Sequence, residues 1–284
     1  MLKTPKANTF FYDHYLETEA LFFEYILKVK GNYEMEDIHQ LRVNMKKLRA
    51  LFRFLESATN KAFRYKDSNK LLKKCFRVAG IIRERQINLE LLKNYELSDK
   101  AYLQYEKYAK LKDKKEKEKL DKAIDALNIV EFEKIGHSFH SFSTKKDLNE
   151  KIELSQNFIG LQIEKIRGIL NHHEEAEKEH RIRIHLKTIK PLLFILSGVP
   201  ESKFGEVHYQ SLKNTEDAIG AWHDRVVLVG SLNQSLSDNQ HKQNHTELEK
   251  VKKTLDTESQ ELLEQIRDKL LETVSLLGGK DKKR

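Results

Sequence analysis

The sequence predicts an all-α protein built as two tandem four-helix bundles, related by a pseudo-two-fold axis. Three observations lead to this expectation. Only three of the 284 residues are proline and eleven are glycine, so few residues interrupt helices. Apolar residues recur with helical spacing along most of the chain. A segment of the first half also returns, in degenerate form, in the second half.

Helical periodicity divides each half into four helices. The expected breaks contain Gly, Asn, Ser, Asp or Pro, and they lie at residues 31–32, 57–60, 98–99, 198–200 and 237–239. In the first half we expect helices over residues 10–30, 34–56, 61–95 and 99–128. In the second half we expect them over residues 147–173, 176–197, 203–234 and 245–277.

These helices group into two domains. Residues 1–135 are expected to form the first bundle and residues 150–277 the second. The segment 136–149 between them has Ser and Thr scattered through it, and it is the expected linker. Residues 278–284, which are rich in Gly and Lys, are expected to form a flexible tail.

Composition excludes several classes of protein. Cys75 is the only cysteine, so neither an internal disulfide nor a multi-cysteine zinc site is available. We find no signal peptide and no stretch of ~20 apolar residues that offers a membrane span, so we expect a soluble, cytoplasmic protein. The net charge is +8, and the whole excess lies in residues 1–140. Such a surplus is typical of a surface that keeps a protein soluble, and also of a protein that binds an anionic partner. The spacing of the cations has to distinguish these two possibilities.

A row of basic residues follows one face of the expected helix 34–56. The members that fall within an arc of roughly 80° are His39, Arg42, Lys46, Arg49 and Arg53. The opposite face carries Leu41, Leu48, Leu51, Phe52 and Leu55. No acid interrupts the row, whereas a solvated face usually mixes both signs. The row therefore favours a bound anion over an ordinary solvated face.

The expected helix 61–95 carries a second row. Its members, within about 60° of arc, are Lys66, Lys70, Lys73 and Arg77. The other side of this helix carries Leu71, Cys75, Val78 and Ile82. Successive helices of a bundle pack side by side, so the two rows could border one groove. Unpaired cations in such a groove repel one another unless an anion neutralises them.

The second half repeats both helices with altered chemistry. At an offset of 141 positions, His180, Arg183, Lys187 and Lys190 match His39, Arg42, Lys46 and Arg49. At an offset of 140, Lys213, Gly220, Asp224 and Arg225 match Lys73, Gly80, Glu84 and Arg85. Phe194 replaces the Arg53 equivalent, while Glu206, Gln210 and Asp217 replace Lys66, Lys70 and Arg77. We therefore predict that two similar halves hold one anionic ligand and that the first half supplies most of the binding energy. Pro191, inside the helix 176–197, should bend that helix or remove a hydrogen bond.

These residues resemble the CHAD domain, the conserved histidine α-helical domain. The family's His-x-x-Arg-Val motif is similar to residues 39–43, which are followed by Lys46, Lys47 and Arg49. Its downstream Leu-Gly-x-x-Arg-Asp-like motif is similar to residues 79–84, with Glu84 in place of Asp. Second copies lie at residues 180–184 and 219–224, although Thr188 stands where the family usually has a second base. The resemblance spans nearly the whole chain.

The resemblance implies two four-helix bundles with pseudo-two-fold symmetry around a basic pore or groove. It also implies binding of inorganic polyphosphate, often at polyphosphate granules, without catalysis. We expect no cofactor. Polyphosphate carries about one negative charge per phosphate, and Arg and Lys hold such groups by charge-assisted hydrogen bonds. Together with the basic rows, it predicts that the polyphosphate-binding residues are His39, Arg42, Lys46, Lys47, Arg49, Arg53, Lys66, Lys70, Lys73, Lys74, Arg77, Arg83, Arg85, His180, Arg183, Lys187, Lys190, Lys213, His223 and Arg225.

His39 and His180 admit other roles. A metal site needs two or three ligands that converge on one ion, and the neighbouring cations disfavour it, so we expect no metal. Contact with phosphate is the favoured role, and helix capping or packing is the alternative. Glu84 and Asp224 are expected to brace basic residues of the groove. They are not expected to act as catalytic acids, because no nucleophile, partner acid or phosphate-binding glycine loop accompanies them.

Nucleic acid is the main alternative ligand, because a basic groove alone does not distinguish polyanions. Proteins that bind single strands usually add aromatic stacking platforms. The basic rows contain no aromatic residue in the first half and only Phe194 in the second. A third hypothesis is an adaptor whose basic face docks an acidic partner protein.

Overall fold

The computed structural model describes residues 9–111, 113–171, 178–237 and 245–279, and all regular structure in them is helical. The helices are α1 (Phe10–Val29), α2 (Met35–Ala58), α3 (Tyr65–Leu92), α4 (Asp99–Lys110), α5 (Asp113–Asp125), α6 (Ile129–Lys145), α7 (Leu148–Asn171), α8 (Lys178–Ser197), α9 (Glu206–Ser237) and α10 (His245–Gly278). The predicted all-α fold is confirmed. None of these helices combines the length and the apolar character that crossing a bilayer requires.

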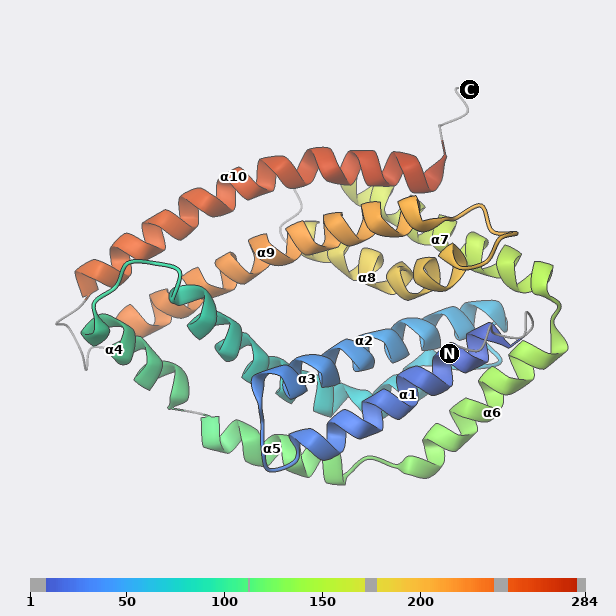
Figure 1. Cartoon of the computed structure of the whole chain (residues 1–284), viewed down its shortest axis with the longest axis horizontal. Coiled ribbons are helices and arrows are strands. Elements are labelled where there is room, and N and C mark those ends of the chain that lie inside the picture. Colours follow the sequence, from blue (N-terminus) through green and yellow to red (C-terminus); the bar gives the residue numbers. More distant parts are fainter. Residues whose placement is uncertain (1–8, 112, 172–177, 238–244, 280–284) are drawn as a thin grey trace.

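The helices lie along two sides of the molecule. Figure 1 shows α7–α10 along one side and α1–α3, α5 and α6 along the other, with α4 near one end. The two sides meet where α2 packs against α7 and α8 and where α3 packs against α9. This arrangement places the second and third helices of each half face to face across the middle of the molecule.

One hydrophobic core runs through both halves. Its fully buried members come from α1–α3 and α5–α10. Phe54 of α2 shows the continuity, because its ring contacts Phe142 of α6 and Phe158 of α7. A second, smaller cluster joins α4 to α9 and α10 through Tyr105, Leu228 and Leu255. The boundary between the halves is therefore not a boundary of the hydrophobic core.

The predicted linker 136–149 is wrong, because most of this segment belongs to helix α6. Phe132, Ile135, Phe139 and Phe142 bury one face of α6 at helical spacing. The Ser and Thr residues that suggested a linker are compatible with the helix, since the hydroxyl of Ser138 donates to the carbonyl of Lys134, four residues earlier.

The predicted helix 99–128 is two helices, α4 and α5. Ser98 caps α4 by accepting a hydrogen bond from the backbone N–H of Ala101. The two helices pack differently, because α4 contacts α3, α9 and α10, whereas α5 packs mainly against α3. Within the described residues the first half thus contains six helices, and the expected four-helix count holds only for the second half.

Two further predictions concerned Pro191 and the C-terminal tail. Helix α8 continues through the buried Pro191, and the carbonyl of Lys187 lacks its usual helical donor because proline has no N–H. In the predicted tail, α10 extends to Gly278, and residues 280–284 lie outside the described residues.

Candidate functional site

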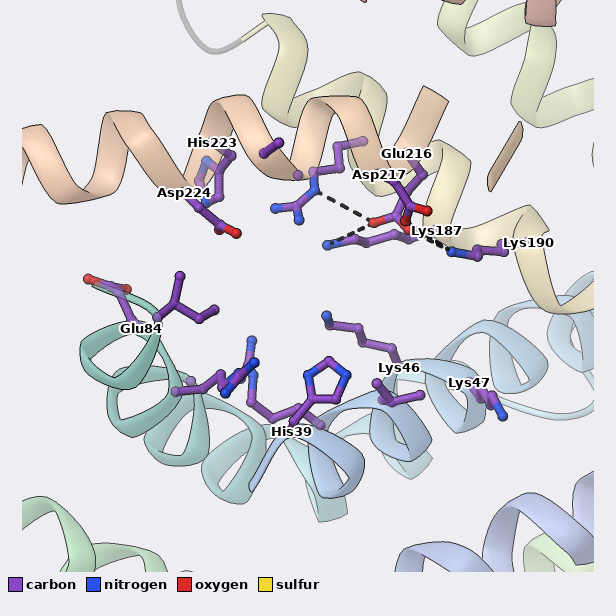
Figure 2. A pocket seen from close by; sticks show the side chains of 18 of the residues that line it. His39, Lys46, Lys47, Glu84, Lys187, Lys190, Glu216, Asp217, His223 and Asp224 are labelled. Carbon is purple, nitrogen blue, oxygen red and sulfur yellow. Dashed lines mark hydrogen bonds and ion pairs between the residues drawn. The ribbon is translucent and has the colours of Figure 1, made fainter. Parts of the chain in front are cut away.

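A pocket of about 790 Å³ lies between α2 and α3 of the first half and α8 and α9 of the second. Figure 2 shows cationic side chains that enter it from both sides. The cations that line it are Arg42, Lys46, Lys47, Arg83, Arg183, Lys187 and Lys190. The same pocket also has carboxylates, namely Glu84, Glu90, Glu216, Asp217 and Asp224.

Helix α2 presents its part of the pocket because its opposite face is apolar. Ile38, Leu41, Met45 and Leu48 are fully buried in the core. Burial of that face at helical spacing leaves His39, Arg42 and Lys46 on the other side of the helix, as predicted from the sequence.

Arg42 is held against α3 by three features. Its guanidinium donates a hydrogen bond of 2.8 Å to the backbone carbonyl of Phe76 and lies 4.5 Å from the centre of the Phe76 ring. It also lies directly over Gly80, where an added Cβ would come within 2.7 Å of Nη1. Burial, followed by repulsion from Arg83, lowers the pKa of Arg42 to about 10, so the side chain is still charged at neutral pH.

The second half repeats this arrangement around Arg183. Gly220 is the partner glycine, and an added Cβ there would come within 3.2 Å of Nη2 of Arg183. The same steric requirement therefore explains the glycine at both positions of the repeat: each leaves room for the arginine of its own half.

Lys46 and Lys187 point toward each other across the pocket (Figure 2). Burial, and then mutual repulsion with Lys187 and repulsion from Arg42, lowers the pKa of Lys46 to about 7. Burial, followed by repulsion from Arg183, lowers the pKa of Lys187 to about 8. Both shifts indicate that the described surroundings do not supply enough negative charge for these two ammonium groups.

Glu216 is the acid that the sequence reasoning missed. Its carboxylate lies 2.8 Å from Lys190, 3.5 Å from Lys187 and 3.7 Å from Arg183 (dashed lines in Figure 2). Burial raises its pKa, but these three cations outweigh burial and hold the pKa below its ordinary value. The signal in the sequence is its position, four residues before Gly220 and so on the same helix face.

Glu84 and Asp224 face each other at the other end of the pocket (Figure 2). Partial burial raises the pKa of both carboxyl groups, and nearby arginines only partly offset it. The expectation that they brace basic residues is wrong for the described part of the chain, where no ion pair holds either carboxylate. Their motif neighbours pair elsewhere, since Arg85 contacts Asp113 at 3.3 Å and Arg225 contacts Glu258 at 2.7 Å.

Two residues of the α2 row turn away from this pocket. Arg49 lies 4.5 Å from the ring centre of Phe76, on α3. Arg53 lies 5.0 Å from the ring centre of Tyr65 and donates to the hydroxyl of Thr188 at 2.8 Å. Arg53 instead lines a second hollow of about 710 Å³ between α2 and α7. This part of α2 lies against α8, because Thr188 belongs to α8 and the two helices pack together.

The row on α3 lies on an exposed face. Its members, Lys66, Lys70, Lys73 and Arg77, are all exposed, as is the neighbouring Lys74, and none of these five residues lines the pocket. Lys70 lies 3.4 Å from the carboxylate of Asp67 on the same helix. The rows of α2 and α3 therefore do not border one common groove, because α3 reaches the pocket only with later residues such as Gly80 and Arg83.

The histidines and Lys213 also separate into two groups. His39 and His223 line the pocket, and burial lowers the pKa of both, that of His223 to about 4. His180 is exposed and contacts the ring of His223 at 5.6 Å, and Lys213 is half-buried; neither lines the pocket. Within the described residues no group of three His, Cys, Asp or Glu is arranged to hold a metal ion.

An aromatic group at one end of the pocket was also missed. Phe194 of α8 is 52% exposed, and its ring lies 5.5 Å from that of Tyr209 on α9 and 5.8 Å from that of His14 on α1. These three come from helices that are distant in sequence, so only their packing brings them together.

Comparisons with known protein families and with solved structures both find matches. A family model described as CHAD domain matches residues 24–233. A solved structure, the crystal structure of the CHAD domain from the plant Ricinus communis, is similar with a TM-score of 0.71 and 17% sequence identity, covering 93% of this chain and 91% of that chain. The search of curated proteins finds no match. The structural likeness concerns the fold, and the family model covers most of the chain.

Proposed function

Because this chain belongs to the CHAD domain family, we propose that its central basic pocket binds inorganic polyphosphate and does not catalyse a reaction on it. The proposal includes association with polyphosphate granules in the cytoplasm. A fluorescent fusion that stays diffuse in cells rich in such granules would contradict that part.

One observation carries the proposal: in the described part of the chain, the cations on the α2 and α3 side of the pocket form no ion pair with an acid. Arg42, Lys46, Lys47 and Arg83 line the pocket, and no ion pair within the described residues neutralises them. Buried like charges that repel one another are unfavourable until an anion joins them. A bound anion would raise the depressed pKa values of Arg42 and Lys46, so binding and charge are thermodynamically linked.

Polyphosphate fits this chemistry because it is a flexible chain of identical anionic units. Guanidinium groups bind phosphate in bidentate form and ammonium groups bind it as point charges. Successive phosphates can contact Arg42 and Lys46, which lie one helical turn apart on α2. No part of such a chain needs a base-specific contact.

A charge-reversed variant tests the proposal. Lys46→Glu places a carboxylate at the centre of the pocket opposite Lys187, which can pair with it, so the fold should be retained. We expect affinity for long-chain polyphosphate to fall by at least about tenfold, the loss of one charge-assisted contact plus new repulsion. Fluorescence anisotropy of labelled polyphosphate measures this, with circular dichroism as the check on folding.

Lys250→Glu is the matched control, because it makes the same change in net charge at an exposed position on α10. It should leave the affinity unchanged. Equal affinity of Lys46→Glu and the parent protein would exclude this pocket as the polyphosphate site.

Nucleic acid is the second candidate ligand, and the exposed ring of Phe194 with Tyr209 favours it. Aromatic rings beside cations can stack bases of a single strand. Competition distinguishes the two ligands: polyphosphate should displace bound RNA at far lower phosphate concentration than RNA displaces polyphosphate. The opposite order would assign the pocket to nucleic acid.

A further inference from the structure

Phe76 and Glu216 occupy equivalent positions in the two copies of the repeat. They are 140 positions apart, the same offset that relates Gly80 to Gly220. The structure supports the equivalence, since each of these glycines leaves room for the arginine of its own half. Phe76 and Glu216 therefore meet corresponding cations from corresponding helices.

Phe76 holds its cations without neutralising them. The guanidinium carbons of Arg42 and Arg49 each lie 4.5 Å from the centre of its ring. A cation–π contact fixes the position of a guanidinium group, but the ring carries no net charge. The charge of Arg42, which lines the pocket, is thus still available to an incoming anion.

Glu216 meets the corresponding cations with a full negative charge. Its carboxylate lies 3.7 Å from Arg183 and 2.8 Å from Lys190, which are the equivalents of Arg42 and Arg49, and also 3.5 Å from Lys187. Glu216 is only 9% exposed, so water and salt screen these ion pairs weakly. Any phosphate that binds the three cations has to compete with an anion that is already in place.

We infer that Glu216 is a specificity-determining residue, an internal counter-anion that keeps ligand phosphates off α8 and confines polyphosphate to the α2 side of the pocket. The inference rests on the proposed function. One position of the repeat, 76 in the first copy and 216 in the second, then decides how many of the pocket's cations a ligand can use. Removal of the carboxylate charge should let one chain contact α2 and α8 together.

The first test titrates tripolyphosphate and long-chain polyphosphate into Glu216→Gln and into the parent protein. We expect the long chain to bind about tenfold more tightly to the variant, the size of one charge-assisted contact, and tripolyphosphate to gain less because it is short. Glu249→Gln removes the same charge from an exposed position on α10 and should change neither affinity. Unchanged or weaker binding of the long chain to a folded Glu216→Gln overturns the inference.

The reciprocal variant decides the question if Glu216→Gln does not fold. Phe76→Glu introduces the counter-anion beside Arg42 and Arg49, and it should weaken long-chain binding by about tenfold. Phe76→Leu removes the ring without adding charge and should weaken binding less. Equal losses in the two variants overturn the inference.

The same titrations separate this inference from the proposed function. If Lys46→Glu lowers the affinity but Glu216→Gln and Phe76→Glu do not act in opposite directions, only the role of Glu216 is refuted. If Lys46→Glu leaves the affinity unchanged, the proposed site itself is refuted.

Discussion

Lys46 is the residue whose charge depends most on what the pocket contains. It faces Lys187 and Arg183 from α8, Arg42 from its own helix and the carboxylate of Glu216 from α9. Burial and these cations lower its pKa to about 7, and that of Lys187 to about 8. At neutral pH the Lys46 ammonium group is therefore only partly protonated, and a bound polyanion should raise both pKa values.

The first prediction is that polyphosphate binding takes up protons between pH 7 and 9. The ligand favours the protonated amines, so its affinity should fall severalfold as the pH rises through this range. Isothermal titration at pH 8 in two buffers of different ionisation enthalpy measures the proton uptake. In Lys46→Arg the guanidinium stays protonated, so the uptake should shrink. An uptake of zero in the parent protein would contradict the pKa shifts.

Gly80 is a second residue on which the pocket depends, because Arg42 occupies the space where a side chain at position 80 would lie. An added Cβ would lie 2.7 Å from Nη1 of Arg42, which is too close for an unshifted guanidinium. The hydrogen bond from this nitrogen to the carbonyl of Phe76 would be strained or lost.

The second prediction is that Gly80→Ala weakens polyphosphate binding severalfold while the helix is kept. Alanine favours a helix over glycine by ~1 kcal/mol, which offsets part of the steric cost. Gly160→Ala in α7 is the matched control, because nothing lies within 4 Å of its added Cβ. That variant should bind normally and should be slightly more stable. Normal binding by Gly80→Ala would show that the position of Arg42 is unimportant.

Among the elements, α6 shows how a polar-looking segment joins the core. Phe139 is fully buried, and its ring is stacked on that of Tyr15 at 4.3 Å. On α6, the hydroxyl groups of Ser138 and Thr144 donate to backbone carbonyls of the same helix. The burial pattern of the aromatic residues, and not the polar composition, decides that this segment is helical.

The third prediction is that Phe139→Ala lowers the free energy of unfolding by ~3–5 kcal/mol, as large-to-small changes in a core do. Ile129, the first residue of α6, is 61% exposed, and Ile129→Ala should cost under ~0.5 kcal/mol. Chemical denaturation followed by circular dichroism measures both. Similar small losses in the two variants would mean that the segment behaves as the linker that its composition suggested.

Helix α2 shows what a helical wheel can predict about a site and what it cannot. The wheel placed His39, Arg42 and Lys46 on one face, and all three line the pocket. It placed Arg49 and Arg53 on the same face, but these two pack against Phe76 and Tyr65 of α3 instead. A wheel describes directions around one axis, whereas the contact with α8 decides which part of the row opens into the pocket.

At the scale of the whole molecule, the two halves of the repeat share one core. Phe54 of α2 is fully buried and contacts aromatic rings of both α6 and α7. Helices that share fully buried side chains lose their packing together when one of them unfolds. The two copies of the repeat are therefore not expected to be independent folding units.

The fourth prediction is that the protein unfolds in one cooperative transition. Trp222, the single tryptophan, lies on α9 in the second half, so its fluorescence reports on that half while circular dichroism reports on all helices. Phe54→Ala should shift both denaturation curves to the same lower midpoint. A fluorescence curve that does not move would show that the halves unfold independently.

The sequence alone determined that the chain is helical, that α2 and α8 carry matching cations, and that Gly80 on α3 recurs as Gly220 on α9. These properties depend on the spacing of residues within one helix, which a helical period of 3.6 residues fixes. Only the tertiary structure decided that Glu216 pairs with one set of cations while Phe76 contacts the other set without an opposing charge. That outcome depends on which side chains of α3 and α9 meet α2 and α8. Contacts between helices arise from the packing of the shared core, and no local period encodes them.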